Sequence, residues 1–584
     1  MNFDQELGQA LKAHEAGRLA EAEAAYNRLL ALRPDHARVI HMLGLIMLQT
    51  NRNELAAKLL TRAAALSPNT ADYHANLGVA LERLDLAEEA IAAYRQALAI
   101  SPNDAVVLCN LSDALRRSQP AQALQFARAA VRALPQYFYA HHCLAKCLMS
   151  AGDVPRAVEA YRTTLRLKDD LPEVHNELGD ALRRIGRSAE AIEEFHRAIH
   201  LQPDYARAHS NLGAALLEVD RLEDAERSIR TALSIDESFP EAHTNLGNFF
   251  LAVSRHSEAI AAFRRAIELR PDYALAHHQL GWSLLLTGDY GAAWPEYEWR
   301  LKVPEFNIPR RDYPRPRWAG EDLSGKRILL YGEQGRGDRI QFARYVPLVA
   351  RRAAKVFLTC QADLMRLYRG LDAAVELIEP GAPPPEFDVH CSLASLPMLF
   401  CTTLATIPPA PYLHADAALS EQWRQRLQSV PAKIKIGLAW AGSPKNKLDR
   451  HRSIPLSAFA PLSQIPDAHF FSLQKGDAAQ QSAAPPSGMA LTDWTADLLD
   501  FADTAALIAN LDCVITVDTA AAHLAGALGK PCYVLLPTAC DWRWLENRPD
   551  SAWYASIRLL RQSTRQDWTA PVSQVAQALA NAAF

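Results

Sequence analysis

The chain has 584 residues, which is too many for one hydrophobic core, so we expect two to four domains. Hydrophobic residues make up 49% of it and charged residues 22%, as is typical of a globular protein in water. The formal net charge of -4 gives no reason to expect a nucleic acid or an anionic membrane as partner.

The cysteines and the first residues bear on the compartment. The nine cysteines form no CxxC pair, and for Cys143 and Cys147, four apart on one expected helix, buried packing explains the spacing better than metal ligation. The chain begins with a charged amphipathic helix, without the basic start and apolar run of a secretory signal. The sequence contains no run of 18 apolar residues, so we expect no membrane-spanning helix. We therefore expect a cytoplasmic protein.

The first half of the chain repeats a residue pattern with a period of 34. The loop-forming positions, with a single step of 33 at Ser118, are Gly17, Asn51, Asp85, Ser118, Gly152, Gly186, Asp220, Ser254 and Gly288. Prolines that end the units are Pro34, Pro68, Pro102, Pro135, Pro203 and Pro271. Between them come a Leu-Gly pair, such as Leu77-Gly78, and a stripe of small and aromatic residues that lets paired helices approach closely. This period predicts about nine helical hairpins in an all-α solenoid, and the pattern resembles the tetratricopeptide repeat over residues 1–302.

One position on the first helix of the hairpins carries carboxamides. They are Asn76, Asn110, Asn211 and Asn245, with Cys143, Glu177 and Gln279 at other copies. A carboxamide both donates and accepts, so a row of them is suited to hold an extended peptide backbone. The row resembles the asparagine ladder on the concave surface of the O-linked N-acetylglucosamine transferase repeats. The alternative is that asparagine is simply frequent at this position in tetratricopeptide repeats.

Two positions earlier stands a row of histidines. They are His74, His141, His175, His209, His243 and His277. Neighbouring helices lie on the order of 10 Å apart, whereas metal–nitrogen bonds are near 2 Å. We therefore interpret the histidines as helix-interface packing residues and expect no metal site.

The pattern stops at residue 302, and the residues that follow have a different character. Residues 303–325 are rich in proline and arginine, which predicts an extended connector whose arginines face solvent or, alternatively, a phosphate. Short apolar runs separated by helical stretches then predict parallel sheets covered on both faces. The runs are Arg327–Tyr331, Val356–Thr359, Val375–Ile378, Ile434–Ala439, His469–Leu473, Cys513–Val517 and Cys532–Leu536. The prolines near 408–411 and a helix over 420–428 divide them into two Rossmann-like lobes, 326–418 and 419–584.

The first lobe carries a glycine-rich loop directly after its first strand. Gly332, Gly335 and Gly337 allow a ligand to approach the backbone closely, and Asp338 stands near the start of the next helix. The alternative is structural, because an aspartate at a helix N-terminus is stabilising by itself.

The second lobe contains a strand, a polar turn and a helix of small residues at positions 514–531. Free N–H groups near Thr519 and Ala520 form an anion site at that helix start, and His523 lies one turn further on. Basic residues follow two other predicted strands of this lobe. Lys445 and Arg452 follow Ile434–Ala439, and Lys475 follows His469–Leu473. They are suited to neutralise a phosphate, although a solvated charged loop is an alternative.

These two motifs resemble the heptosyltransferase group, glycosyltransferase family 9, over residues 326–584. The resemblance implies the GT-B architecture of two Rossmann-like lobes around a cleft, and an inverting reaction without a metal ion or other cofactor. By resemblance, Asp338 is the general base, while Asp518, Thr519 and His523 hold the nucleotide diphosphate of the donor. Arg452 falls near a lysine of the family that contacts the donor phosphate.

Two departures from the family pattern leave the function open. Ala520 replaces the usual glycine, and the first lobe, which normally holds the acceptor, is short. We expect a glycosyltransferase that moves a sugar from a nucleotide-sugar donor to a hydroxyl of a protein presented by the repeats. The alternatives are an interaction scaffold with a degenerate transferase module, and a transferase that acts on a lipid or saccharide acceptor.

Overall fold

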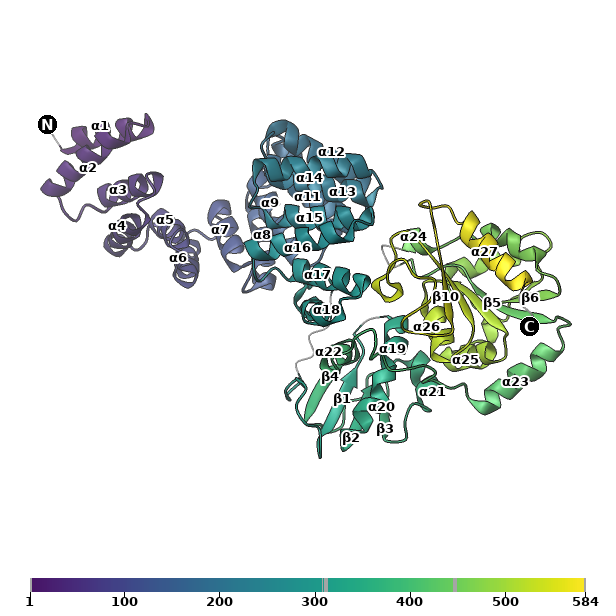
Figure 1. Cartoon of the computed structure of the whole chain (residues 1–584). Helices are drawn as coiled ribbons and strands as arrows, with labels where there is room; N and C mark the ends of the chain where they lie inside the picture. The colour runs from purple at the N-terminus through teal and green to yellow at the C-terminus, as the bar shows by residue number, and fades with distance from the viewer. Residues whose placement is uncertain (1–2, 307, 309–312, 334, 445–448, 582–584) are drawn as a thin grey trace. The chain divides into compact units, whose positions relative to one another are not determined.

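The computed structural model describes residues 3–306, 308, 313–333, 335–444 and 449–581 (Figure 1). The chain divides into two compact units, Met1–Asn245 and Leu246–Phe584, which are described separately.

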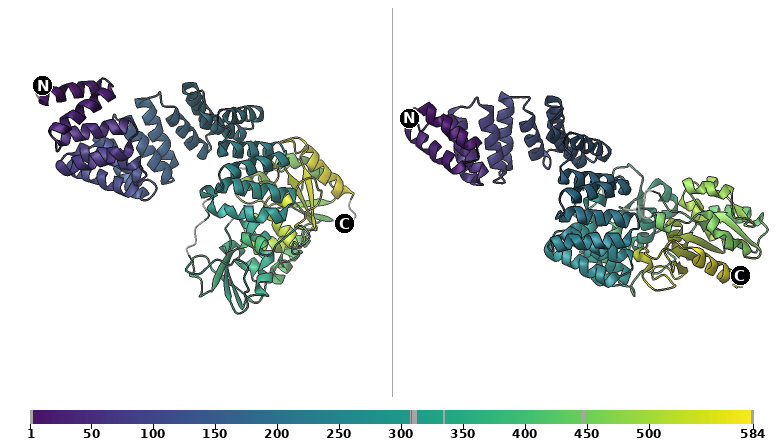
Figure 2. Two further views of the ribbon diagram at one scale, coloured as in Figure 1. Left: turned by 60° about the vertical axis from the view of Figure 1, so that its left-hand side comes forward. Right: turned by 90° about the horizontal axis from the view of Figure 1, so that it is seen from above.

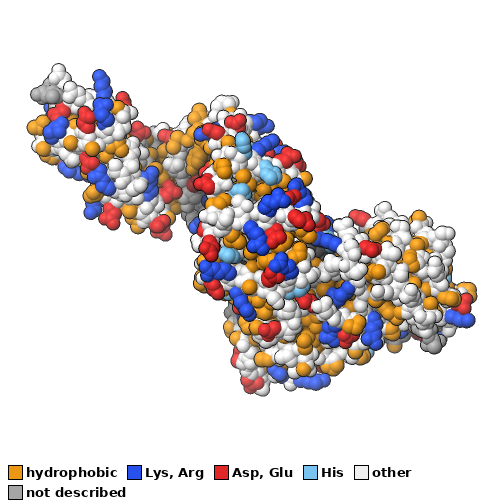
Figure 3. Space-filling model, turned by 45° about the horizontal axis from the view of Figure 1, so that its top comes forward, with side chains coloured by type: hydrophobic (Ala, Val, Ile, Leu, Met, Phe, Trp, Pro, Cys, Tyr) orange, Lys and Arg blue, Asp and Glu red, His pale blue; other side chains and the backbone are white. Residues whose placement is uncertain are grey.

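The first unit is built of helical hairpins, each packed on the next along the chain (Figure 1). Acidic and basic side chains are interspersed over the face of these helices shown in Figure 3. The helices are α1 (Phe3–Glu15), α2 (Leu19–Leu32), α3 (Ala37–Gln49), α4 (Asn53–Leu66), α5 (Ala71–Glu82), α6 (Ala87–Ile100), α7 (Ala105–Leu115), α8 (Pro120–Ala133), α9 (Phe138–Ser150), α10 (Val154–Leu167), α11 (Pro172–Arg184), α12 (Ser188–Leu201), α13 (Ala206–Glu218), α14 (Leu222–Ile235) and the first part of α15 (Pro240–Ala252).

The glycine of each Leu-Gly pair lets the two helices of a hairpin touch, as the sequence predicts. A Cβ on Gly78 would lie 2.5 Å from the ring of Tyr94, and one on Gly179 would lie 2.6 Å from the ring of Phe195. The turns depend on left-handed backbone, with φ of 57° at Asn51 and 78° at Gly152. At the shortened step, α7 ends at Leu115 and the turn closes through a Gln119 N–H donating to the Leu115 carbonyl at 2.7 Å.

The second unit begins with helices of the same kind. They are the rest of α15, α16 (His256–Leu269), α17 (Ala274–Thr287) and α18 (Tyr290–Tyr297), followed by the 3₁₀ segment η1 (Glu298–Lys302). A Cβ on Gly281 would lie 2.4 Å from the backbone nitrogen of Tyr297, so α17 and α18 are in backbone contact there.

The first lobe has a four-stranded parallel sheet in the order β3-β2-β1-β4. Its strands are β1 (Arg327–Tyr331), β2 (Lys355–Thr359), β3 (Val375–Ile378) and β4 (Val389–Ser392). Its helices are α19 (Arg336–Phe342), α20 (Val346–Ala350), α21 (Met365–Tyr368) and α22 (Leu396–Leu399).

The second lobe has a six-stranded parallel sheet in the order β10-β9-β8-β5-β6-β7. This is the Rossmann order, with the strand order reversing between β5 and β8. Its strands are β5 (Ile434–Ala439), β6 (Ala468–Ser472), β7 (Leu491–Thr492), β8 (Cys513–Val517), β9 (Cys532–Leu536) and β10 (Ile557–Arg561). Its helices are α23 (Ala417–Gln428), α24 (Asp449–Arg452), α25 (Phe501–Ala509), α26 (Ala520–Ala527) and α27 (Thr569–Ala580). All seven predicted strands are present, to within one residue at each end, while β4, β7 and β10 were not predicted.

The connector is exposed over most of its described length, as expected, but it is anchored to the first lobe at Arg317 and Trp318. His390 of β4 forms a parallel bridge with Arg317, in which the Trp318 N–H donates to the His390 carbonyl at 2.8 Å. The Trp318 side chain is buried, and Arg317 contacts Glu298 and Ser395. Arg310 and Arg311 lie outside the described residues.

Helix α18 packs on both lobes of the second unit. Figure 2 shows the ribbon from two further directions. The Trp294 indole N–H donates to the Thr402 carbonyl of the first lobe at 2.8 Å. The Trp553 indole N–H of the second lobe donates to the Tyr290 hydroxyl at 2.9 Å. The last helical hairpin is therefore part of the same core as the two sheets.

Candidate active site

The carboxyl ends of β5 and β8 carry the predicted donor-binding residues. Asp518 directly follows β8, and Arg452 lies in the segment after β5, with its Nη1 3.9 Å from the Asp518 carboxylate. This is the point where the strand order reverses, which is where ligands bind on open parallel sheets. The Thr519 hydroxyl caps α26 by accepting from the Ala521 N–H at 3.3 Å, so Ala520 is the first residue of that helix.

Asp338 lies in the first turn of α19, and its carboxylate is paired with Arg543 of the second lobe. The Arg543 guanidinium is almost fully buried and also donates to Asp541 at 2.9 Å and to the Gln341 side chain. Burial raises the pKa of Asp338, and the positive charge of Arg543 counteracts that rise. The pKa of Asp338 is raised on balance, because burial outweighs the charge of Arg543.

Asp518 lies in an environment that disfavours its ionised form. Burial, and then the charge of Asp541, raise the pKa of Asp518 to about 6, although Arg452 acts in the opposite direction. A carboxyl group that titrates this close to neutrality is a feature common at functional sites.

His523 is held in place by one hydrogen bond and by ring stacking. Its Nδ1 is hydrogen-bonded to the Tyr554 hydroxyl at 3.1 Å, and its ring stacks on Trp544 at 5.4 Å between centroids. Burial holds the pKa of His523 well below its ordinary value, so the ring is neutral.

The motifs of the two lobes meet at Gly337 and His523. A Cβ on Gly337 would lie 2.8 Å from the His523 Cδ2, so only glycine permits this approach. Gly335 is the N-cap of α19, where a Cβ would lie 3.4 Å from the Asp338 Oδ2. The structure thus brings Gly335, Gly337 and Asp338 to the same place as Asp518, Thr519 and His523.

One of the predicted basic residues, Lys475, is not part of this cluster. The Lys475 ammonium donates to the backbone carbonyls of Thr495 and, at 2.8 Å, Leu498. Lys445 lies outside the described residues. A phosphate-binding role for either residue stays a prediction.

Sequence reasoning missed the segment that follows β9, positions 540–545. Asp541, Arg543 and Trp544 reach the cluster from there, and Arg561 holds the segment by donating to the Trp544 and Leu545 carbonyls at 2.7 and 2.8 Å. A signal was present in the sequence, because an aspartate and an arginine interleaved with two tryptophans follow a strand of apolar residues after four intervening residues.

The predicted peptide-binding asparagines use part of their hydrogen-bonding capacity between neighbouring repeats. The Asn211 side-chain amide donates to the Asn176 carboxamide oxygen at 2.9 Å, and that of Asn245 donates to the Ser210 hydroxyl at 2.9 Å. Asn76 contacts His41 in the same way at 3.0 Å, and Asn110 is half-buried on α7. The carboxamides therefore link successive repeats as well as lining one side of them.

The row of histidines has a different role from the predicted interface packing. In each of the six, the ring Nε2 is hydrogen-bonded to the backbone carbonyl six residues earlier, at 2.9 to 3.0 Å. Each imidazole thus fastens the loop that precedes its own hairpin. His175 and His277 also contact Glu194 and Glu296 through Nδ1.

Comparison with known proteins agrees with the helical repeats of the fold. Models described as tetratricopeptide repeat match residues 7–69, 41–105, 111–172 and 240–273, and one described as TPR repeat matches 179–220. The chain contains tetratricopeptide repeats. Such repeats are protein-interaction scaffolds, and a protein partner is the function that they indicate.

Individual proteins are similar to parts of the chain. Protein FlbA of Caulobacter vibrioides is 30% identical over 321 residues, which are 51% of this chain and 53% of FlbA, so the chain matches about half the length of that relative. The structure of the APC/C hetero-tetramer Cut9-Hcn1 has a TM-score of 0.38 at 17% identity, covering 46% of this chain and 52% of that one. PilF of Pseudomonas aeruginosa has a TM-score of 0.33 at 22% identity, covering 35% and 94%. Within the described residues, no helix has both the length and the apolar character that crossing a membrane requires.

The tetratricopeptide repeats of the first unit enclose a groove of about 510 Å³. Among the residues that line it are Arg116, Lys146, Asn176, Asp180, Arg184 and Asn211. Charges of both signs stand beside the carboxamides, together with the apolar side chains of Met149 and Phe239. A groove with this mixture suits a polypeptide segment better than a ligand of one charge.

Proposed function

We propose that the chain is a glycosyltransferase that moves a sugar from a nucleotide-sugar donor to a hydroxyl of a protein held by the repeats. The proposal is supported chiefly by one observation, the meeting of the glycine loop of one lobe with the α26 motif of the other at Gly337 and His523. Those are the two motifs whose family resemblance implies a base and a donor site.

In the proposed reaction, Asp338 takes the proton of the acceptor hydroxyl, and the oxygen attacks the anomeric carbon of the donor. The bond from that carbon to the diphosphate breaks, and the nucleoside diphosphate leaves with the electron pair. The N–H groups at the start of α26 and the charge of Arg452 would stabilise the leaving diphosphate, without a metal ion by the family resemblance. Asp338 has one oxygen on Arg543, which leaves the other to accept the proton.

The experiment that tests this proposal is incubation of the full chain with labelled nucleotide sugars and cell extract, followed by separation of protein from lipid and saccharide. Label in protein that depends on Asp338 supports the proposal. Label in lipid or saccharide would instead support the alternative acceptor. Absence of transfer with every donor would contradict the enzymatic function.

The second candidate is an interaction scaffold whose α/β lobes no longer catalyse transfer. The observation that favours it is the pairing of Asp338 with a buried arginine, whose charge counteracts the rise in pKa that burial gives this carboxyl group. Calorimetry with UDP, GDP, ADP and CDP separates the two candidates, because a scaffold without a donor site binds none of them.

A further inference from the structure

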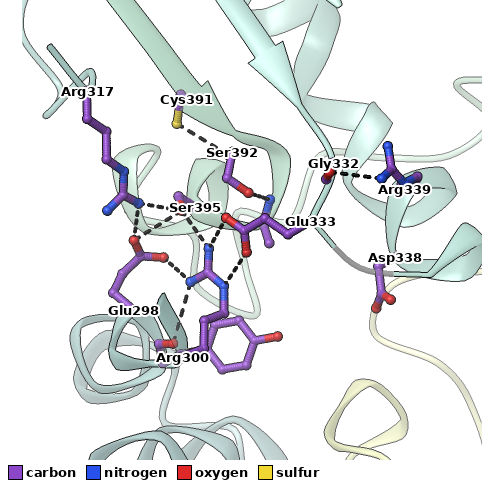
Figure 4. Close-up of polar contacts among 12 residues, drawn as sticks. Glu298, Arg300, Arg317, Gly332, Glu333, Asp338, Arg339, Cys391, Ser392 and Ser395 are labelled. Atoms are coloured by element: carbon purple, nitrogen blue, oxygen red, sulfur yellow. Dashed lines mark hydrogen bonds and ion pairs between the residues drawn. The ribbon is translucent and has the colours of Figure 1, made fainter. Parts of the chain in front are cut away.

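The crevice of the first lobe is occupied by a side chain from the end of the helical repeats. In the order β3-β2-β1-β4, the crevice lies between the carboxyl ends of β1 and β4. Glu333 follows β1 and Ser395 follows β4, and the Arg300 guanidinium from η1 contacts both (Figure 4). A position where such sheets ordinarily bind ligands is thus filled from within the chain.

Arg300 is held by a complete set of partners. Its Nε and Nη2 donate to the two oxygens of Glu333 at 2.9 and 3.2 Å, and Nη2 also donates to the Ser395 hydroxyl at 2.7 Å. Its Nη1 donates to Glu298 and, at 3.5 Å, to the Tyr297 carbonyl. Arg300 is 0% exposed and the Glu333 side chain 2%. Burial would lower the pKa of Arg300, but Glu298 and Glu333 outweigh it and raise that pKa.

The glycine-rich loop and the helix start after it are contacted by buried arginines at two residues. Arg300 contacts Glu333 at its start, and Arg543 contacts Asp338 at its end (Figure 4 shows Asp338 beyond the Arg300 cluster). The two hydrogen bonds from the Arg300 guanidinium to the Glu333 carboxylate fix the orientation of that carboxylate as well as its distance, because they join two N–H groups to two oxygens. An ammonium group in its place would supply charge without that geometry.

We propose that Arg300 is a positioning residue for Asp338, which it reaches through Glu333, so that the end of the repeat array sets the geometry of the catalytic base. The expected effect of Arg300 on kcat rests on the proposed transferase function, whereas its effect on the order of α19 does not. It also follows that the acceptor does not enter between β1 and β4, since that place is taken.

Hydrogen exchange in the full chain tests the structural consequence. Arg300→Lys and Glu333→Gln are each expected to raise the exchange rate of the first α19 amides, such as that of Arg339, by about tenfold. The control is Arg327→Lys, because Arg327 makes a comparable fork to Asp388 at the opposite end of β1, on the surface. Unchanged α19 exchange in Glu333→Gln would overturn the proposal, and this variant decides the question if Arg300→Lys unfolds the lobe.

Steady-state kinetics tests the effect of Arg300 on kcat once a donor and acceptor are found. Arg300→Lys is expected to lower kcat roughly 10- to 100-fold, because a small displacement of the base is sufficient for such a loss. The dissociation constant of the nucleoside diphosphate should stay within about twofold, since α26 binds it. A raised donor KM with unchanged kcat would overturn the positioning role. Should the wild-type chain transfer no sugar, the proposed function fails, and hydrogen exchange still decides the role of Arg300.

Discussion

Arg543 donates to the carboxylate of Asp338 across 205 positions of sequence and across the two lobes of one unit. The pairing joins a segment that sequence reasoning missed to the residue that it singled out.

Asp338→Asn is expected to abolish measurable transfer, because the amide cannot take the proton of the acceptor. General-base catalysis contributes on the order of 10²- to 10⁴-fold, so kcat should fall by at least that range while nucleotide binding persists. The measurement is single-turnover transfer with labelled donor. Asp388→Asn, at the exposed amino-terminal edge of the same sheet, is the matched control, and full transfer by Asp338→Asn would refute the assignment.

Arg543→Met removes a buried guanidinium and leaves the half-buried carboxylates of Asp338 and Asp541 without their counter-charge. Removing one partner of a buried pair costs roughly 3–5 kcal/mol, which urea unfolding would detect. Because Arg543 counteracts the raised pKa of Asp338, its loss raises that pKa further. The ascending limb of the pH–rate profile should therefore move to higher pH. Arg327→Met, which breaks an exposed pair, should cost less than about 1 kcal/mol, and equal losses in both variants would contradict the prediction.

We expect the Asp518→Asn variant to become more stable relative to the wild-type chain as the pH rises. The pKa of Asp518 is raised to about 6 in the folded chain, against about 3.9 when unfolded, so between these values the folded state binds more protons. Its free energy of unfolding therefore falls as pH rises through this window. The asparagine of the variant does not titrate, so its free energy of unfolding does not fall in this way. Relative to wild type, that free energy should rise by roughly 1–3 kcal/mol between pH 4 and pH 7. A difference that does not change with pH, measured by urea unfolding, would count against it.

Gly337→Ala places a methyl group against the His523 ring, which cannot move because Tyr554 and Trp544 hold it. Overpacking of this kind costs about 1–3 kcal/mol and should separate the two motifs enough to reduce transfer. Thermal unfolding and transfer assays measure both effects. Gly370→Ala is the control, since nothing lies within 4 Å of its added Cβ.

Asn211→Ala is expected to weaken acceptor binding without changing kcat for donor hydrolysis. One lost hydrogen bond to a peptide backbone costs about 1 kcal/mol, or roughly fivefold in affinity. Fluorescence anisotropy with a peptide from the labelled acceptor gives the dissociation constant. Asn27→Ala, an exposed asparagine on a second helix, should leave it unchanged, and equal affinities of the two variants would show that the carboxamide row does not contact the acceptor.

The repeats and most strands could be predicted from sequence because their signals are local. A 34-residue period and runs such as Cys513–Val517 depend only on neighbouring residues. Strand β4 escaped prediction because its buried residues include the polar His390 and Ser392. The His390 ring contacts Tyr313, far away in the chain, and the Ser392 hydroxyl accepts from the Ala394 N–H in the turn that follows. Strand β10 carries Arg558 and Arg561, so its apolar pattern is interrupted.

The candidate site was harder to predict than the fold. Asp338 and Asp518 belong to recognisable motifs, whereas Arg543 acquires its role only when two lobes meet. Likewise, nothing in the proline-arginine stretch indicated that Arg317 joins Glu298 beside Ser395, since that depends on tertiary contacts alone.

The bridge between Arg317 and His390 has a practical consequence for anyone who shortens this chain. Strand β4 is the last strand of its sheet, and the connector covers its open hydrogen-bonding edge. An uncovered edge strand is a template for pairing with other molecules. A fragment that begins at β1 would expose this edge and the apolar surface beneath Trp318, and we expect it to aggregate during expression. The shortest well-behaved fragment therefore has to retain the connector and the helices before it.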